Sequence, residues 1–91
     1  MPRYLVEAYV PHSQAQDALA AGRRACALAR ELSLEGLHVR HVRTTFLPDD
    51  ETCFHFFEAT SAQAVDELCR RAGIDSPRIV PTVEQPDGDA D

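Results

Sequence analysis

The spacing of hydrophobic residues changes repeatedly along this chain of 91 residues, and the order of the changes limits the folds open to it. Residues 3–10, 39–46, 52–58 and 78–83 have the alternation, or the β-branched and aromatic content, of strands. Residues 15–32 and 61–72 instead repeat apolar side chains every three or four positions, as amphipathic helices do. The predicted order is strand, helix, strand, strand, helix, strand.

This order predicts an α+β fold of the ferredoxin-like βαββαβ type, with a four-stranded antiparallel sheet and both helices on one face. We expect residues 1–83 to form that single domain. Residues 84–91 hold four acidic residues together with Pro86 and Gly88. This composition predicts a disordered acidic tail.

The charged residues exclude several classes of function. The nine basic residues are all arginine, so lysine chemistry is absent, and the formal net charge is −6. Binding to nucleic acid or to an anionic membrane requires a basic surface, so neither partner is expected. The strand at residues 52–58 also lacks the basic start and the glycine of an RNA-recognition motif.

The sequence also indicates in which cellular compartment the protein is expected. It has no secretory leader pattern and no apolar run long enough to span a membrane. The three cysteines are an odd number at wide spacing, which suits neither a disulfide framework nor a CxxC metal site. We therefore expect reduced thiols and a cytoplasmic location.

Strand alternation gives a first map of the sheet face that the helices leave open. If Phe46 pairs with Thr52, then Arg43 lies opposite His55 and His41 lies opposite Phe57. Phe54 and Phe56 would then point toward the helices. The residues expected on the open face are Leu5, Glu7, Tyr9, His41, Arg43, Cys53, His55 and Phe57.

An open face with three large apolar side chains, Leu5, Tyr9 and Phe57, is expected to be covered. A second copy of the sheet, joined face to face about a twofold axis, would cover it and form a homodimer like the α+β barrels. A chain this short also gains stability from a partner. The alternative is that the tail or a loop folds over the sheet.

The polar residues of the same face suggest a metal site. In this register His41 and His55 are diagonal neighbours, with Cα atoms about 7–8 Å apart. Glu7 would add a carboxylate, and Cys53 is a possible fourth ligand. Two histidines and a carboxylate suit iron, nickel or zinc. The central charge of Arg43 opposes a cation, so these residues alternatively belong to a wet interface or a small-molecule pocket.

Evidence for catalysis is weak. On a strand, the side chains of Cys53 and His55 stand about 6.5–7 Å apart, which is long for direct proton transfer. No acid–base pair and no glycine-rich phosphate loop is present. We therefore lean against an enzyme and predict no catalytic residues.

Several segments resemble a widespread bacterial family of small domains of unknown function. They are residues 43–59 (RTTFLPDDETCFHFFEA), 61–65 (SAQAV), 70–74 (RRAGI) and the opening 1–7 (MPRYLVE). The resemblance extends over about residues 1–83. It implies a ferredoxin-like fold, dimerisation and, because one branch of the family binds nickel, possible metal binding.

Two hypotheses follow. The first is a small cytoplasmic homodimer that binds nickel, or another divalent transition metal, through His41, His55, Glu7 and Cys53 on the open face. The second is a metal-free module that binds or senses a small molecule, or a degenerate enzyme of the dimeric-barrel type. In the second hypothesis the ligand lies between the sheet and the helices.

Overall fold

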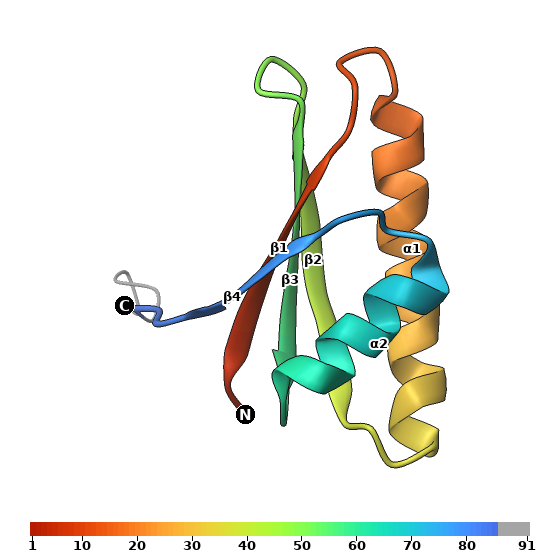
Figure 1. The fold of residues 1–91 in the computed structure, drawn as a ribbon, viewed down its shortest axis with the longest axis vertical. Helices are drawn as coiled ribbons and strands as arrows, with labels where there is room; N and C mark the ends of the chain where they lie inside the picture. The colour runs from red at the N-terminus through yellow and green to blue at the C-terminus, as the bar shows by residue number, and fades with distance from the viewer. Residues whose placement is uncertain (86–91) are drawn as a thin grey trace, which may run out of the picture.

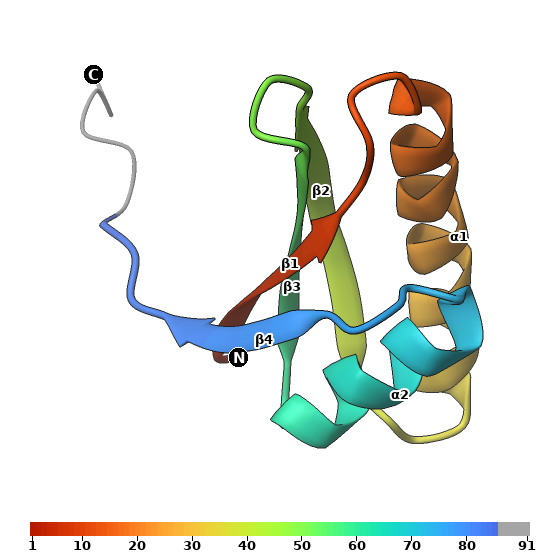
Figure 2. The same cartoon turned by 45° about the horizontal axis from the view of Figure 1, so that its top comes forward.

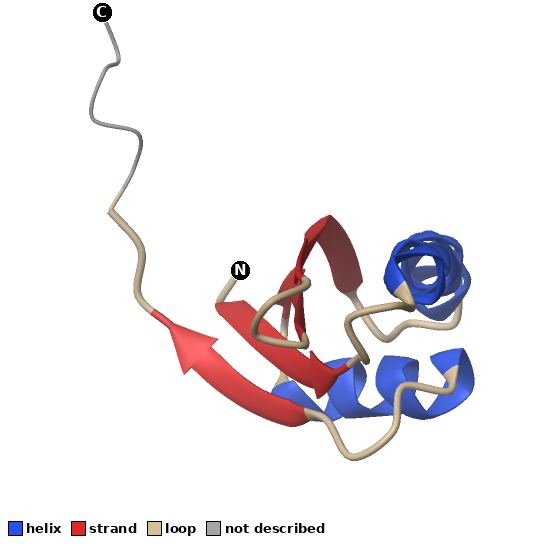
Figure 3. Cartoon of the chain, turned by 90° about the horizontal axis from the view of Figure 1, so that it is seen from above, coloured by secondary structure: helices blue, strands red, loops and turns tan. Residues whose placement is uncertain are grey.

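The computed structural model describes residues 1–85 and contains six elements in the predicted order. The four strands form one antiparallel sheet with the order β2-β3-β1-β4, and both helices lie on the same side of it (Figures 1 and 3). The predicted ferredoxin-like α+β fold is confirmed. The elements are β1 (Arg3–Tyr9), α1 (Ala15–Leu34), β2 (Val39–Leu47), β3 (Thr52–Ala59), α2 (Ala62–Ala72) and β4 (Arg78–Thr82).

Helix α1 packs over β2 and contacts α2. It approaches the sheet closely because small residues form much of its buried side, among them Ala18, Ala25 and Ala29. At Gly22 a Cβ atom would stand only 2.6 Å from Thr44 Oγ1, so no side chain fits there. The glycine therefore brings the helix backbone directly against β2.

Helix α2 packs over β3 and β4, beside α1 (Figure 2). It begins at the N-cap Ser61, whose hydroxyl accepts a hydrogen bond from the backbone N–H of Ala64. It ends at Gly73, which adopts the left-handed conformation that favours glycine. Val65 and Leu68 are fully buried and join the core formed with β1, β3 and α1.

Strand β4 is an edge strand, as the proline within it predicts. Of the predicted acidic tail, residues 86–91 lie outside the described part of the chain. Glu84 accepts hydrogen bonds from Arg3 and from Thr82. In residues 1–85, neither helix combines the length and apolar character that a membrane crossing needs.

The register between β2 and β3 differs from the prediction near the turn. Leu47, not Phe46, pairs with Thr52, so the connecting loop is one residue shorter than expected. The pairing shifts again between His41 and Arg43, where Val42 is the extra residue of a β-bulge. The bulge restores the predicted pairing of His41 with Phe57.

The shift reverses the predicted faces of β3. Cys53, His55 and Phe57 are buried on the side covered by the helices, whereas Phe54 and Phe56 lie on the open side. The prediction of an open-face location is therefore wrong for these three residues and for His41, which contacts the ring of Phe57. The prediction is right for the other four residues. The open side of the sheet carries Leu5, Glu7, Tyr9 and Arg43.

Candidate functional site

Four side chains form a continuous hydrogen-bonded series between the sheet and α1, which we call the buried polar chain. It runs from His41 through Thr44 and His55 to Cys53. His41 Nε2 is 2.8 Å from Thr44 Oγ1, and Thr44 Oγ1 is 2.7 Å from His55 Nδ1. His55 Nε2 is 3.5 Å from Cys53 Sγ. The first link runs along β2, the second crosses from β2 to β3, and the third runs along β3.

Local structure explains the series. Thr44 pairs directly with His55 across the two strands, so their side chains share one face. The bulge at Val42 places His41 on that face as well. Because Gly22 of α1 lies against Thr44, the helix backbone covers this part of the series.

Burial fixes the charge state of the series. His55 is 1% exposed, and desolvation lowers its pKa to about 4, helped by the positive charges of His41 and Arg24. Desolvation also lowers the pKa of His41. It raises the pKa of the Cys53 thiol to about 11. At neutral pH the His55 imidazole is therefore neutral and the thiol keeps its proton.

Two proton arrangements satisfy every member of the series. In one, His55 Nδ1–H donates to Thr44, the threonine hydroxyl donates to His41, and the Cys53 thiol donates to His55 Nε2. In the other, every donor and acceptor is exchanged. The first arrangement leaves a lone pair on His55 Nε2, which is the form that binds a metal ion.

Glu7, the fourth predicted ligand, lies on the opposite face of the sheet. Its carboxylate accepts a hydrogen bond of 2.6 Å from Arg78 of the neighbouring strand. The four predicted ligands therefore do not form one group. In the described residues, no group of three or more histidine, cysteine, aspartate or glutamate side chains is placed to hold one ion.

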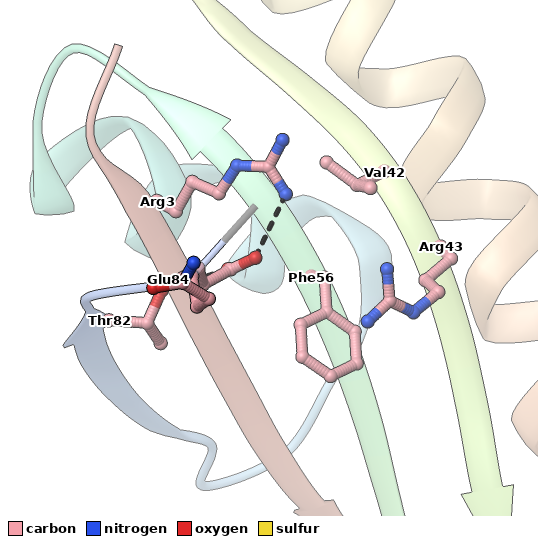
Figure 4. Close-up of a pocket in the computed structure, with 7 residues that line it drawn as sticks. Arg3, Val42, Arg43, Phe56, Thr82 and Glu84 are labelled. Carbon is pink, nitrogen blue, oxygen red and sulfur yellow. Dashed lines mark hydrogen bonds and ion pairs between the residues drawn. The ribbon is translucent and has the colours of Figure 1, made fainter. Parts of the chain in front are cut away.

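The open face has a different character (Figure 4). The Arg43 guanidinium lies 4.2 Å from the centre of the Phe56 ring, in a cation–π contact. Arg3 pairs with Glu58 at 2.8 Å and with Glu84 at 3.1 Å. Charged pairs and partly exposed aromatic rings thus alternate across this surface.

A cavity of about 290 Å³ opens between the end of β1, the start of β3, α1 and residues 73–75, which follow α2. Cys53 and His55 both line it, so the end of the buried polar chain faces this space. Its other polar lining includes Gln14, Asp17, Arg24 and Asp75.

Sequence reasoning missed Thr44, Gly22 and Arg24 as parts of this site. Gly22 carries a usable signal, because glycine inside a helix is unfavourable and often marks a close approach of two backbones. Thr44 and Arg24 offer no such signal, because nothing in the sequence distinguishes them from any other threonine in a strand or arginine in a helix.

A family model described as "Nickel responsive protein SCO4226-like" matches residues 4–82, a range that runs from β1 to β4. No curated protein and no solved structure matches the chain. The resemblance of about residues 1–83 to a family of small bacterial domains is confirmed. The chain belongs to the SCO4226-like family of nickel responsive proteins.

Proposed function

We propose that this protein binds Ni²⁺, or a related divalent transition metal, at the cavity end of the buried polar chain. The description of the family as nickel responsive supports a role for that ion. The observation that carries the proposal is the pair formed by Cys53 Sγ and His55 Nε2, 3.5 Å apart at the cavity.

The donor pair suits such an ion. Bonds to sulfur and to nitrogen of about 2.3 and about 2.0 Å, as at zinc, allow one ion to touch two atoms at this separation. Thiolate and imidazole are both good ligands for nickel, copper and zinc. A bound ion would supply the positive charge that keeps the Cys53 thiol deprotonated despite its burial.

Thr44 and His41 would support the ligand. Metal-binding histidines usually donate their second ring N–H to a neighbouring acceptor, which fixes the orientation and the tautomer of the ring. Thr44 Oγ1 lies 2.7 Å from His55 Nδ1, and His41 follows at 2.8 Å. His41 lies on the opposite side of His55 from Cys53, so it positions the ligand and is not itself a ligand.

Calorimetry with Ni²⁺ and Zn²⁺ on tag-free protein tests the proposal. We expect one ion per chain, and at least a tenfold loss of affinity for Cys53→Ala and for His55→Gln. Cys69→Ala is the matched control, because Cys69 is equally buried and its pKa is also raised to about 11. Equal binding by wild type and both ligand variants would refute the site.

We also propose that the open face pairs with a second copy of the chain. Phe54 and Phe56 are only partly buried there, and Tyr9 is 70% exposed. The face carries both charge signs in neighbouring strands, as in the pair of Glu7 with Arg78, so it can meet a copy of itself about a twofold axis. An aromatic surface of this kind is rarely left in contact with water.

Sedimentation equilibrium tests the dimer. Wild type is expected at twice the mass of the 10.1 kDa chain. Phe56→Asp, which puts a charge at the centre of the face, should sediment as a monomer. Gln63→Asp is the control, because it puts the same charge on an exposed position of α2. A monomeric wild type at micromolar concentration would refute the proposal.

A cytoplasmic location remains part of this proposal. All three cysteines, Cys26, Cys53 and Cys69, are free, which suits a reducing compartment.

A further inference from the structure

The proposed metal site and dimer leave the surface between α1 and the edge strand β2 without a role. Two hollows, of about 700 and about 300 Å³, lie between these elements, which run side by side in Figure 1. Cys26 and His41 line both hollows, so the two adjoin. We call them together the α1–β2 groove. It extends along α1 from Leu19 to Leu34, about four helical turns.

The groove has an exposed apolar lining. Six large apolar side chains of residues 1–85 are exposed, and three of them line the groove, namely Met1, Leu19 and Leu34. Ala29 and Val39 line it as well and are almost fully buried. Apolar surface that is gathered in a hollow of this kind favours the binding of a hydrocarbon group.

The charged lining of the groove is basic, although the chain as a whole has a formal net charge of −6. None of the described residues that line the groove is aspartate or glutamate, whereas Arg23, Arg30 and Arg40 are among them. Arg40 pairs with Glu58 at 3.0 Å. Within residues 1–85, Arg23 and Arg30 pair with no carboxylate. The groove therefore complements a molecule with an apolar body and a negative end.

A small molecule suits the groove better than an added protein strand. The outer edge of β2 has free backbone groups, but the bulge at Val42 interrupts the regular geometry that strand pairing requires. The volumes of the two hollows are typical of small-molecule sites. Because the groove follows α1 for several turns, an unbranched chain fits it better than a compact ring.

We propose that the α1–β2 groove binds a linear carboxylic acid of the fatty-acid class. The hydrocarbon chain lies along α1 on the apolar lining, and the carboxylate pairs with the guanidinium of Arg30, whose planar fork matches it. Arg30 lines the larger hollow together with the exposed His38, which offers a second hydrogen-bond donor. This binding needs neither the metal ion nor the dimer.

Equilibrium dialysis of the full chain with three carbon-14 probes, each below its micellar concentration, tests the proposal. Decanoate has both the chain and the charge, 1-decanol has the chain alone, and acetate has the charge alone. Wild type should bind one decanoate per chain, 1-decanol at least tenfold more weakly, and no measurable acetate.

Substitution of Arg30 tests the position of the carboxylate. Arg30→Gln should bind decanoate at least tenfold more weakly and 1-decanol as wild type does, which also shows that the groove is intact. Arg70→Gln is the matched control, because it removes one exposed arginine from the other helix, and it should bind decanoate as wild type does.

Alkylation of Cys26 tests the position of the chain. Cys26 is partly exposed, whereas Cys53 and Cys69 are buried, so iodoacetamide should react first at Cys26. Saturating decanoate should slow this reaction at least fivefold, as measured by mass spectrometry. Saturating acetate should leave its rate unchanged.

Four results would overturn the proposal. They are a wild type that binds no decanoate, equal affinities for decanoate and 1-decanol, undiminished binding of decanoate by Arg30→Gln, and a rate of Cys26 alkylation that bound decanoate does not change. Because nickel takes no part in these measurements, each result leaves the proposed metal site to be judged by its own calorimetry.

Discussion

Phe57 and Phe56 are consecutive residues of one strand, yet they have opposite environments. Phe57 is fully buried beneath the helices, among core residues such as Val6 and Leu68. Phe56 lies on the open face under the guanidinium of Arg43. The same strand therefore supplies an aromatic ring to the core and another to a surface that a partner can cover.

Polar side chains also have different surroundings on the helix-covered face and on the open face of the sheet. On the helix-covered face, His55 and its neighbours bond to one another because water is excluded, and the described residues contain no buried polar side-chain atom without a partner. On the open face, Glu7 and Arg78 pair within reach of solvent. Loss of a partner is costly on the first face and nearly neutral on the second.

The largest expected difference between the faces is in packing. Phe57→Ala should lower the free energy of unfolding by about 3–5 kcal/mol, because it removes a fully buried ring. Phe56→Ala is the matched comparison, and its effect should depend on protein concentration if the open face forms the dimer. Urea unfolding at two concentrations measures both, with Phe57→Leu as a milder variant. Equal losses at both positions would contradict the assignment of faces.

The second expected effect is a pH dependence of stability in metal-free protein. The folded pKa of His55 is about 4, against an ordinary value of 6.5, so folding favours the neutral ring. Its contribution is fully present above pH 6.5 and is lost as the pH falls toward 4, on the order of 3 kcal/mol.

Urea unfolding in the presence of a chelator, at several pH values from 7.5 to 4, measures this loss. In His55→Gln the slope between pH 6.5 and 4 should be much shallower. His38→Gln is the control, because His38 is exposed. A wild-type slope that His55→Gln leaves unchanged would show that the ring is not buried in its neutral form.

Gly22→Ala should destabilise the protein by about 1–3 kcal/mol, although alanine is the better helix former. The new methyl group would stand 2.6 Å from Thr44 Oγ1, so α1 or β2 has to shift. At the exposed Ala27 of the same helix the opposite change, Ala27→Gly, should cost about 1 kcal/mol through helix propensity alone. Thermal unfolding compares the two, and a stabilised Gly22→Ala would refute the close approach.

The smallest effect is expected on the open face. Glu7→Gln should change the free energy of unfolding by less than about 1 kcal/mol, since its pair with Arg78 is accessible to solvent. It should also leave nickel affinity unchanged, unlike His55→Gln. A marked loss of nickel binding in Glu7→Gln would return the metal site to the open face.

The amino-acid sequence determined the order of elements, the edge position of β4, and which residues of β1 face the helices. In each case a local pattern decides the structure: the change of hydrophobic period, Pro81 within a strand, or the alternation of Val6 and Ala8 with polar Glu7. Such signals do not depend on what lies across the fold.

Only the tertiary structure decided the faces of β3 and therefore the candidate site. Phenylalanine occurs on both sides of this strand, so alternation alone cannot distinguish them. The choice depends on a loop shorter by one residue, on the bulge at Val42, and on Gly22 bringing α1 onto Thr44. Because strand faces alternate with every residue, a register shift of one residue moves Cys53 and His55 from an exposed surface to a buried cavity.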